Sequence, residues 1–281
     1  MTAILGGLGA AVMWAVSTLS TSRSTKLVSP VSVLATVMTI GVVIAAPVAL
    51  AQGVPDALGG TELAWLLTSG SANLVGLLFS YSALRVGKVG VVAPINSAQG
   101  AAAAVIAMLL GERIAATSGV MLAVIVVGVV LASLSRAVEA GGEHDARGAL
   151  LAGIAALLFG LGLYASGRLA DDLPLAWIVF VPRLLGVLVF AVPMVLLGRV
   201  RMTRAALPFV LVSGVCEIAG LAAFTLGARD SVAVTAVISS QFAALAAIVA
   251  YFAFDERLRR VQVAGVAAIL VGVAVLTGLQ A

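Results

Sequence analysis

The chain has 281 residues, of which 62% are hydrophobic and 10% are charged. This composition excludes an ordinary water-soluble domain, in which about a quarter of the residues are charged. The formal net charge of +4 does not indicate nucleic-acid binding, because no basic patch is interleaved with aromatic residues.

Long apolar runs fill the chain from end to end. A membrane-spanning helix needs about 20 mainly apolar residues. The runs are continuous rather than alternating, which favours helices over the strands of a barrel. We expect ten spans, in chain order near residues 2–22, 30–50, 62–84, 90–111, 116–135, 147–167, 175–197, 205–227, 232–252 and 261–280.

The second five expected spans resemble the first five. Shifting the first half of the chain forward by 144 positions places Ser69 on Ser213 and Gly76 on Gly220. The same shift matches Gly70 with Gly214, Arg85 with Arg229, Glu112-Arg113 with Glu256-Arg257, and Pro30 with Pro174. Because each copy has an odd number of spans, the copies must cross the membrane in opposite directions, as in carriers with a site between inverted halves. We therefore expect an all-α integral membrane protein of two inverted five-helix repeats, residues 1–136 and 145–281.

The basic residues of the short loops predict an orientation. Loops on the side of the amino terminus carry Arg113, Arg168 and Arg229, whereas loops on the other side carry twelve Lys and Arg residues. Short loops rich in Lys and Arg stay in the cytoplasm. We expect a multi-pass protein of the plasma (inner) membrane with both termini outside the cytoplasm.

A repeated motif closes the fourth and ninth expected spans. These spans of small residues end in Gly111-Glu112-Arg113 and Asp255-Glu256-Arg257, and each is followed by a short turn and a Gly-rich helix. Together with Trp14 in the first span and Pro182-Arg183 in the seventh, this pattern resembles the drug/metabolite transporter superfamily, in its ten-helix group built from two EamA domains. The resemblance implies an exporter of small metabolites, amino acids or toxic organic compounds that works by alternating access.

The chain departs from that family pattern in the first repeat. The Arg of the second helix of each repeat is present as Arg183 in the second copy, whereas the first copy has Met38 and Thr39 there. The basic residue that usually ends the first helix is shifted or replaced by Arg23. These differences concern single residues and leave the expected fold unchanged.

Two ionised side chains lie inside the expected spans, Arg183 and Glu217. A charge at the centre of a spanning helix costs about 2.5–3.5 kcal/mol on insertion scales, so such a group persists only when it is paired, hydrated or useful. The two residues differ in depth by roughly 4–5 Å at the rise of an α-helix. We expect a buried ion pair or a shared polar cavity, which serves either as a structural clasp or as a proton-coupling or substrate-binding site.

Further polar and aromatic residues lie deep in the expected spans. Asn73, Ser80 and Tyr81 share one face of the third span by their spacing. The repeat places Asn73 opposite Glu217, and amide groups in the fourth and ninth spans must point inward. An interhelical hydrogen bond, worth about 0.6 kcal/mol, would also explain each of these polar residues taken alone. The candidate substrate-binding residues are Trp14, Asn73, Tyr81, Asn96, Gln99, Tyr164, Glu217, Phe224, Ser240 and Gln241.

The sequence favours transport over catalysis. An intramembrane enzyme needs a compact set of carboxylates, histidines or a nucleophile at depth, and the sequence has neither this nor a metal-ligand set or phosphate-binding loop. We expect no cofactor and no metal. The expected function is secondary active transport of a small amphipathic solute by alternating access, with or without protons as the coupling ion. The alternatives are a facilitative uniporter or exchanger, and a non-transporting scaffold; the small-residue faces of the fifth and tenth spans allow a monomer or a homodimer.

Overall fold

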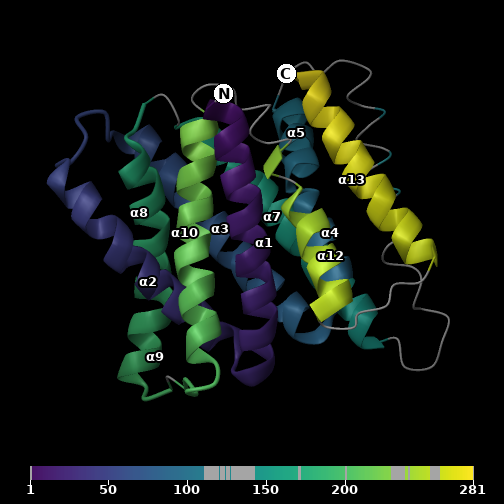
Figure 1. Cartoon of the computed structure of the whole chain (residues 1–281). Helices are drawn as coiled ribbons and strands as arrows, with labels where there is room; N and C mark the ends of the chain where they lie inside the picture. The colour runs from purple at the N-terminus through teal and green to yellow at the C-terminus, as the bar shows by residue number, and fades with distance from the viewer. Residues whose placement is uncertain are drawn as a thin grey trace.

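The computed structural model describes residues 2–110, 143–169, 172–199, 201–228, 241–253 and 260–280, together with Val120, Val124, Val127, Ile238 and Ser239. Every regular element among them is a helix (Figure 1). The elements are α1 (Thr2–Leu27), α2 (Pro30–Ala51), α3 (Gly60–Val86), α4 (Val89–Ser97), α5 (Gln99–Leu109), α7 (Glu143–Gly167), α8 (Leu175–Gly186), the π-helix η1 (Val187–Ala191), α9 (Val192–Leu196), α10 (Leu207–Ala228), α12 (Phe242–Ala253) and α13 (Arg260–Gln280).

Nine of the ten expected spans contain described helices, and of the ninth, 232–252, α12 covers the second half. The fourth is divided into α4 and α5, and the seventh is the continuous series of α8, η1 and α9. The fifth, 116–135, lies outside the described residues apart from Val120, Val124 and Val127. Six helical segments of the described chain are long and apolar enough to cross a bilayer. The protein is therefore an integral, multi-pass membrane protein. The described residues do not include all ten expected spans.

Many large apolar side chains point outward. Leu5, Leu150, Leu188, Leu196 and Ile248 are each more than half exposed. In water such a surface would promote association, whereas in a bilayer it is the surface that faces the lipid chains. The buried interior is correspondingly small and contains many alanines and glycines, which let the helices approach closely.

Helix α3 runs antiparallel along α7. A Cβ atom on Gly76 would lie 2.8 Å from Cδ1 of Phe159, and one on Gly87 would lie 3.4 Å from Cα of Gly148. Later positions of α3 thus meet earlier positions of α7. The absence of a side chain at Gly76 is what admits the Phe159 ring between the two helices.

Helix α1 makes the equivalent contact with α10. A Cβ atom on Gly220 would lie 2.5 Å from Nε1 of Trp14, and one on Gly6 would lie 2.7 Å from Cα of Gly227. Since α1 and α10 correspond to α7 and α3 in the repeat, each repeat lends its first helix to the third helix of the other. Short loops join α1 to α2 and α2 to α3, so successive helices alternate in direction and α1 is parallel to α3. Because α3 is antiparallel to α7, α1 and its counterpart α7 point in opposite directions.

Helices α2 and α8 cross each other at a reciprocal contact. Gly41 of α2 lies under the side chain of Arg183, and Gly186 of α8 lies under the side chain of Met38. The repeat exchanges α2 with α8, so their crossing must map onto itself. Met38 then corresponds to Arg183 and Gly41 to Gly186, an offset of 145. The offset of 144 that matches Ser69 with Ser213 is therefore one residue short for the first two helices, and Met38 rather than Thr39 is the counterpart of Arg183.

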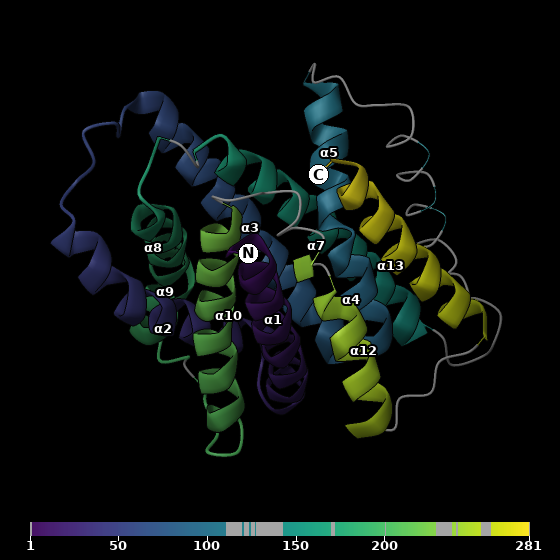
Figure 2. The same cartoon turned by 45° about the horizontal axis from the view of Figure 1, so that its top comes forward.

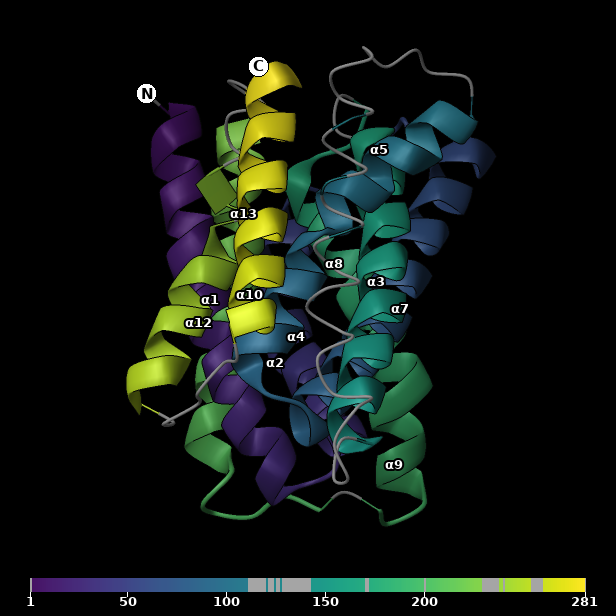
Figure 3. The same cartoon turned by 90° about the vertical axis from the view of Figure 1, so that its right-hand side faces the viewer.

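The helices gather in two groups around α1, α3 and α7. Figure 2 shows α2, α8 and α10 on one side and α5, α12 and α13 on the other. In the side view, α12 and α13 lie in front of α4, which contacts both (Figure 3). The two ends of the described chain lie at the same end of the bundle (Figure 1).

Candidate functional site

A buried arginine joins three helices at the centre of the first group. Arg183 lies in α8 directly after Pro182, and its side chain is 2% exposed. Its Nη1 donates a hydrogen bond to Oδ1 of Asn73 on α3 at 3.2 Å. Its Nη2 lies 3.5 Å from Oε1 of Glu217 on α10, the distance of an ion pair. Gly41 on α2 leaves the space that the aliphatic part of the side chain fills.

The two charged groups of this pair differ in accessibility. The side chain of Glu217 is 15% exposed, against 2% for Arg183. Neutralisation by a partner lowers the cost of holding either charge in an apolar interior, where an unpaired ion costs several kcal/mol. The carboxylate is therefore the more accessible member of the pair, while the guanidinium is enclosed by protein.

Hydroxyl groups surround the carboxylate. Oγ of Ser213 lies 2.6 Å from Oγ1 of Thr21 and 3.2 Å from Oγ of Ser17. Ser17 also interacts with Glu217, one turn further along α10. The hydroxyl of Tyr81 lies near Ser213 and Thr21, is fully buried, and has no hydrogen-bond partner of good geometry. We call these five residues, with Asn73 and Arg183, the central polar cluster: Ser17, Thr21, Asn73, Tyr81, Arg183, Ser213 and Glu217.

Three of the residues expected at a substrate site thus lie in this cluster. The sequence places Asn73 opposite Glu217 across the repeat axis, and the structure brings both to one guanidinium. Tyr81 follows two turns after Asn73 on the same face of α3, and it reaches the hydroxyl side of the cluster. The roles of these residues in binding or coupling stay predictions.

Asn96 and Gln99 flank the break between α4 and α5. Asn96 is buried, and its Nδ2 donates a hydrogen bond to Oγ of Ser80 on α3 at 2.8 Å. The helix is interrupted at Ala98, and Gln99 is the first residue of α5. The hydroxyl of Ser97 donates a hydrogen bond to the backbone carbonyl of Pro94. Pro94 itself has no backbone N–H to donate within the helix. Asn96 is thus held by α3 and not by the charged pair.

The expected aromatic residues separate into two places. Trp14 packs against Phe224 and Phe242, with ring centroids 5.8 and 6.2 Å apart, and lies over Gly220, one turn from Glu217. Tyr164 instead packs on Trp65 at 6.0 Å, two turns of α3 before Asn73. Trp14 and Phe224 therefore border the central polar cluster, whereas Tyr164 lies towards one end of the bundle.

Two expected features fall at the edge of the described chain. Gln241 is partly buried in the turn that precedes α12, with its N–H donating to the carbonyl of Ile238. Ser240, Glu112-Arg113 and Glu256-Arg257 lie outside the described residues.

Sequence reasoning missed the hydroxyls of α1 and α10. Ser17, Thr21 and Ser213 were not candidates for the site, because each is a single small polar residue in an apolar span. A signal was nevertheless present: seven of the nine residues from Ser17 to Thr25 are Ser or Thr. Such a density of hydroxyl groups inside a membrane helix is a local departure from the apolar pattern of the other spans.

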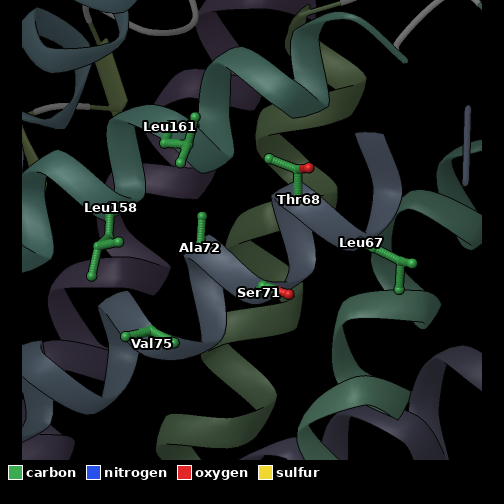
Figure 4. A pocket seen from close by; sticks show the side chains of 7 residues that line it. All are labelled: Leu67, Thr68, Ser71, Ala72, Val75, Leu158 and Leu161. Atoms are coloured by element: carbon green, nitrogen blue, oxygen red, sulfur yellow. The ribbon is translucent and has the colours of Figure 1, made fainter. Parts of the chain in front are cut away.

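A groove on the outside of the bundle is separate from this cluster. It has a volume of about 460 Å³ between α3 and α7 and is lined by Leu67, Thr68, Ser71, Ala72, Val75, Leu158 and Leu161 (Figure 4). Its walls are mainly apolar and partly exposed, and it includes none of the candidate site residues. In a bilayer this groove faces lipid chains. Within the described chain, no three His, Cys, Asp or Glu residues are grouped as a metal site would require.

Comparison with known proteins agrees with the repeat architecture. A protein of known crystal structure aligns with 100% of this chain and 97% of its own, at 21% identity and a TM-score of 0.67, so it shares the fold. No curated protein matches the chain. The model of the EamA-like transporter family matches twice, over residues 1–134 and 146–278. The chain therefore belongs to the EamA-like transporter family and is a membrane transporter of small solutes.

Proposed function

We propose that the protein is a secondary active exporter that moves a small organic, amphipathic solute by alternating access, with Glu217 as its proton-coupling carboxylate. The observation that carries this proposal is the pair of Arg183 and Glu217 in the second repeat, at its contact with Asn73 of the first, with the carboxylate as the more accessible partner. A buried charge that a proton can neutralise gives the site two states of different net charge. Two such states are what coupling to a proton gradient requires.

The inverted architecture supports the alternating-access part. Each repeat packs its first helix against the third helix of the other, so the two interfaces are equivalent by symmetry. A carrier can then open to either side by exchanging the two arrangements around a fixed central site. The break between α4 and α5 at Ala98, and the turn at Gln241 before α12, are nearly equivalent positions at which such motion can bend the bundle.

The environment of Arg183 supports a role for protonation. With Glu217 ionised, the guanidinium is neutralised by the carboxylate and also donates to Asn73. When Glu217 takes up a proton, or binds a cationic group of a solute, the attraction to Arg183 weakens and Asn73 keeps the guanidinium in place. The same carboxylate can then serve the proton and the solute in turn, which couples their movements.

The aromatic residues and the loops support the remaining parts of the proposal. Trp14 and Phe224 provide an apolar wall beside one carboxylate, which suits an amphipathic organic solute better than an inorganic ion. The loop before α10 carries Arg199, Arg201 and Arg204, whereas the loop between α2 and α3 carries Asp56 and no basic residue. By the positive-inside rule the Arg-rich end is cytoplasmic, and both termini are outside.

The test compares Glu217→Gln with the purified wild type in proteoliposomes. A panel of organic solutes is first screened by thermal stabilisation, and the stabilising solute is used in flux assays with and without a pH gradient. We expect Glu217→Gln to fold and to exchange solute, but to lose uphill transport driven by the gradient. Glu62→Gln, which changes a carboxylate at the start of α3, is the matched control and should retain it. Gradient-driven uphill transport by Glu217→Gln would assign the pair to a structural clasp and favour a facilitator or exchanger.

A further inference from the structure

The hydroxyl-rich end of α1 has more polar groups than helix packing needs. Five of its seven hydroxyl residues are buried: Ser17, Thr21, Ser22, Ser24 and Thr25. A buried hydroxyl without a partner costs free energy, which Ser17, Thr21, Ser24 and Thr25 avoid by hydrogen bonding. The Oγ of Ser22 is buried and has no partner in the described structure.

These hydroxyls form a chain that starts at Glu217. Ser17 interacts with the carboxylate, and its Oγ lies 3.2 Å from Oγ of Ser213. Ser213 in turn lies 2.6 Å from Oγ1 of Thr21. A hydroxyl is both a donor and an acceptor, and its hydrogen can rotate between partners. A proton can therefore pass along such a chain by successive donation.

The hydroxyl-to-hydroxyl contacts reach Thr21, the member of the chain nearest the end of α1. Beyond it, the hydroxyls of Ser24 and Thr25 donate to the backbone carbonyl of Thr21, at 3.1 and 2.8 Å. From Thr21 to the last residue of the helix, Leu27, the distance is about 9 Å at the rise of an α-helix. The hydroxyl of Tyr81 lies beside Thr21 and Ser213 and is buried without a good partner. The Tyr81 hydroxyl can therefore donate to or accept from the middle of the hydroxyl chain.

The equivalent interface of α3 with α7 lacks this chain, although its helices are arranged in the same way. Ser69 and Ser166, with Oγ atoms 2.6 Å apart, are the counterparts of Ser213 and Thr21. At the offset of 145, the remaining hydroxyl positions of α1 correspond in the sequence to residues without a hydroxyl: Gly162, Leu163, Ala165, Gly167, Leu169 and Ala170. One hydroxyl pair is thus sufficient to join the helices. Of these two interfaces, the additional hydroxyls occur at the one that contains Glu217.

We propose that Ser17, Ser213 and Thr21 form a proton path that leads from Glu217 towards the end of α1 near Lys26. The path rests on the proposed function, in which Glu217 takes up a proton. It leads towards the side whose loops are rich in Arg and Lys, so the carboxylate exchanges protons with that side. Solute and proton then reach the same carboxylate by different routes.

The charged and titratable groups around Glu217 are few. Arg183 faces it from α8, Tyr81 from α3, and Cys216 is its neighbour on α10. Helix α1 contributes hydroxyls at this level and carries Arg23 and Lys26 nearer its end, and α2 has no ionisable residue. A change in the rate of protonation after substitution of α1 hydroxyls therefore reports on the path and not on a lost charge.

The experiment measures protonation of Glu217 directly with protons as the probe. Wild-type protein is placed in proteoliposomes in one orientation, and the pH is changed rapidly on one side. The infrared carbonyl band of the protonated carboxyl, identified by its absence from Glu217→Gln, is followed in time. Titration at equilibrium first shows whether Glu217 takes up a proton at all.

We expect Thr21→Val and Ser213→Ala to slow the appearance of the band by about 100-fold after a jump on the Lys26 side, the lower end of what a positioned proton-transfer group contributes. Thr21→Ser should restore the rate, because it restores the hydroxyl. Ser69→Ala and Ser166→Ala, which remove the equivalent pair at the interface of α3 with α7, should leave the rate unchanged.

The outcomes separate the path from the proposed function. A band that titrates in every variant, with equal rates in wild type and Thr21→Val, overturns the path and leaves the coupling role of Glu217 intact. A band that is absent at every pH contradicts the coupling role itself, and the path with it. Thermal unfolding of each variant in detergent establishes that the variants compared are folded.

Discussion

The interface of α1 with α10 and that of α3 with α7 share a backbone arrangement and differ in chemistry. In both, a glycine of the third helix admits an aromatic ring, Trp14 over Gly220 and Phe159 over Gly76. In both, hydroxyl groups meet at 2.6 Å. The first interface contains the carboxylate of Glu217, whereas the second has the neutral Asn73 at the equivalent position. The comparison indicates that the symmetric contacts form the scaffold, and that the residues which break the symmetry carry the function.

The asymmetry is largest at the crossing of α2 and α8. Arg183 and its counterpart Met38 occupy equivalent places against Gly41 and Gly186. One is a cation paired with Glu217, and the other is an apolar side chain of similar length. A guanidinium on one side only means that a single carboxylate, and not two, is neutralised at the centre.

Making this crossing symmetric should have the largest effect. Arg183→Met leaves Glu217 buried without its partner, so we expect a loss of stability of about 3–5 kcal/mol. The double variant Arg183→Met with Glu217→Gln removes both charges and should recover most of that loss. Thermal unfolding in detergent and folded yield measure both. Equal stability of the single and double variants would contradict the ion pair.

Removing the second partner of Arg183 should have a smaller effect. Asn73→Leu deletes a hydrogen bond to a charged group, which is worth about 1.5–3 kcal/mol. Asn73→Asp keeps an acceptor at the same place and serves as the control. The two variants are compared by thermal unfolding. A stability of Asn73→Leu equal to that of the wild type would show that the 3.2 Å contact does not hold the guanidinium.

The shared part of the frame can be tested with matched glycines. A methyl group at Gly76 or at Gly220 would press against the facing ring, and overpacking costs about 1–3 kcal/mol. Both Gly→Ala variants should lose stability to a similar degree, because the two contacts are equivalent. Gly153→Ala is the control, since a Cβ there meets no atom within 4 Å. A loss at only one of the two glycines would show that the interfaces are not energetically equivalent.

The smallest effect is expected for the hydroxyl pairs. Ser69→Ala and Ser213→Ala each remove an interhelical hydrogen bond, worth about 0.6 kcal/mol in membrane proteins. The two variants should therefore have nearly equal unfolding temperatures. We expect them to differ in gradient-driven transport, which only Ser213→Ala should impair. Equal transport in both would leave the hydroxyls of α10 with a packing role alone.

The sequence was a good guide to the elements and to the charged centre. Long apolar runs located eight of the described spans to within a few residues, because a bilayer imposes both length and composition, and they located the described second half of the ninth. Arg183 and Glu217 were found because a charge in an apolar run is costly and therefore conspicuous. Tyr164 shows the limit of the same reasoning: it is aromatic and lies in a span, but it packs on Trp65 away from the cluster.

What the sequence by itself determined is the membrane-spanning, twofold-repeated architecture, since hydropathy and repeat spacing are properties of the chain alone. Only the tertiary structure decided that Asn73 is a partner of Arg183, that Met38 is the counterpart of that arginine, and that the hydroxyls of α1 reach Ser213. A one-residue change of helix register moves a side chain by about 100° around the axis. An ungapped offset therefore finds the repeat, whereas the facing of individual side chains follows only from how the helices pack.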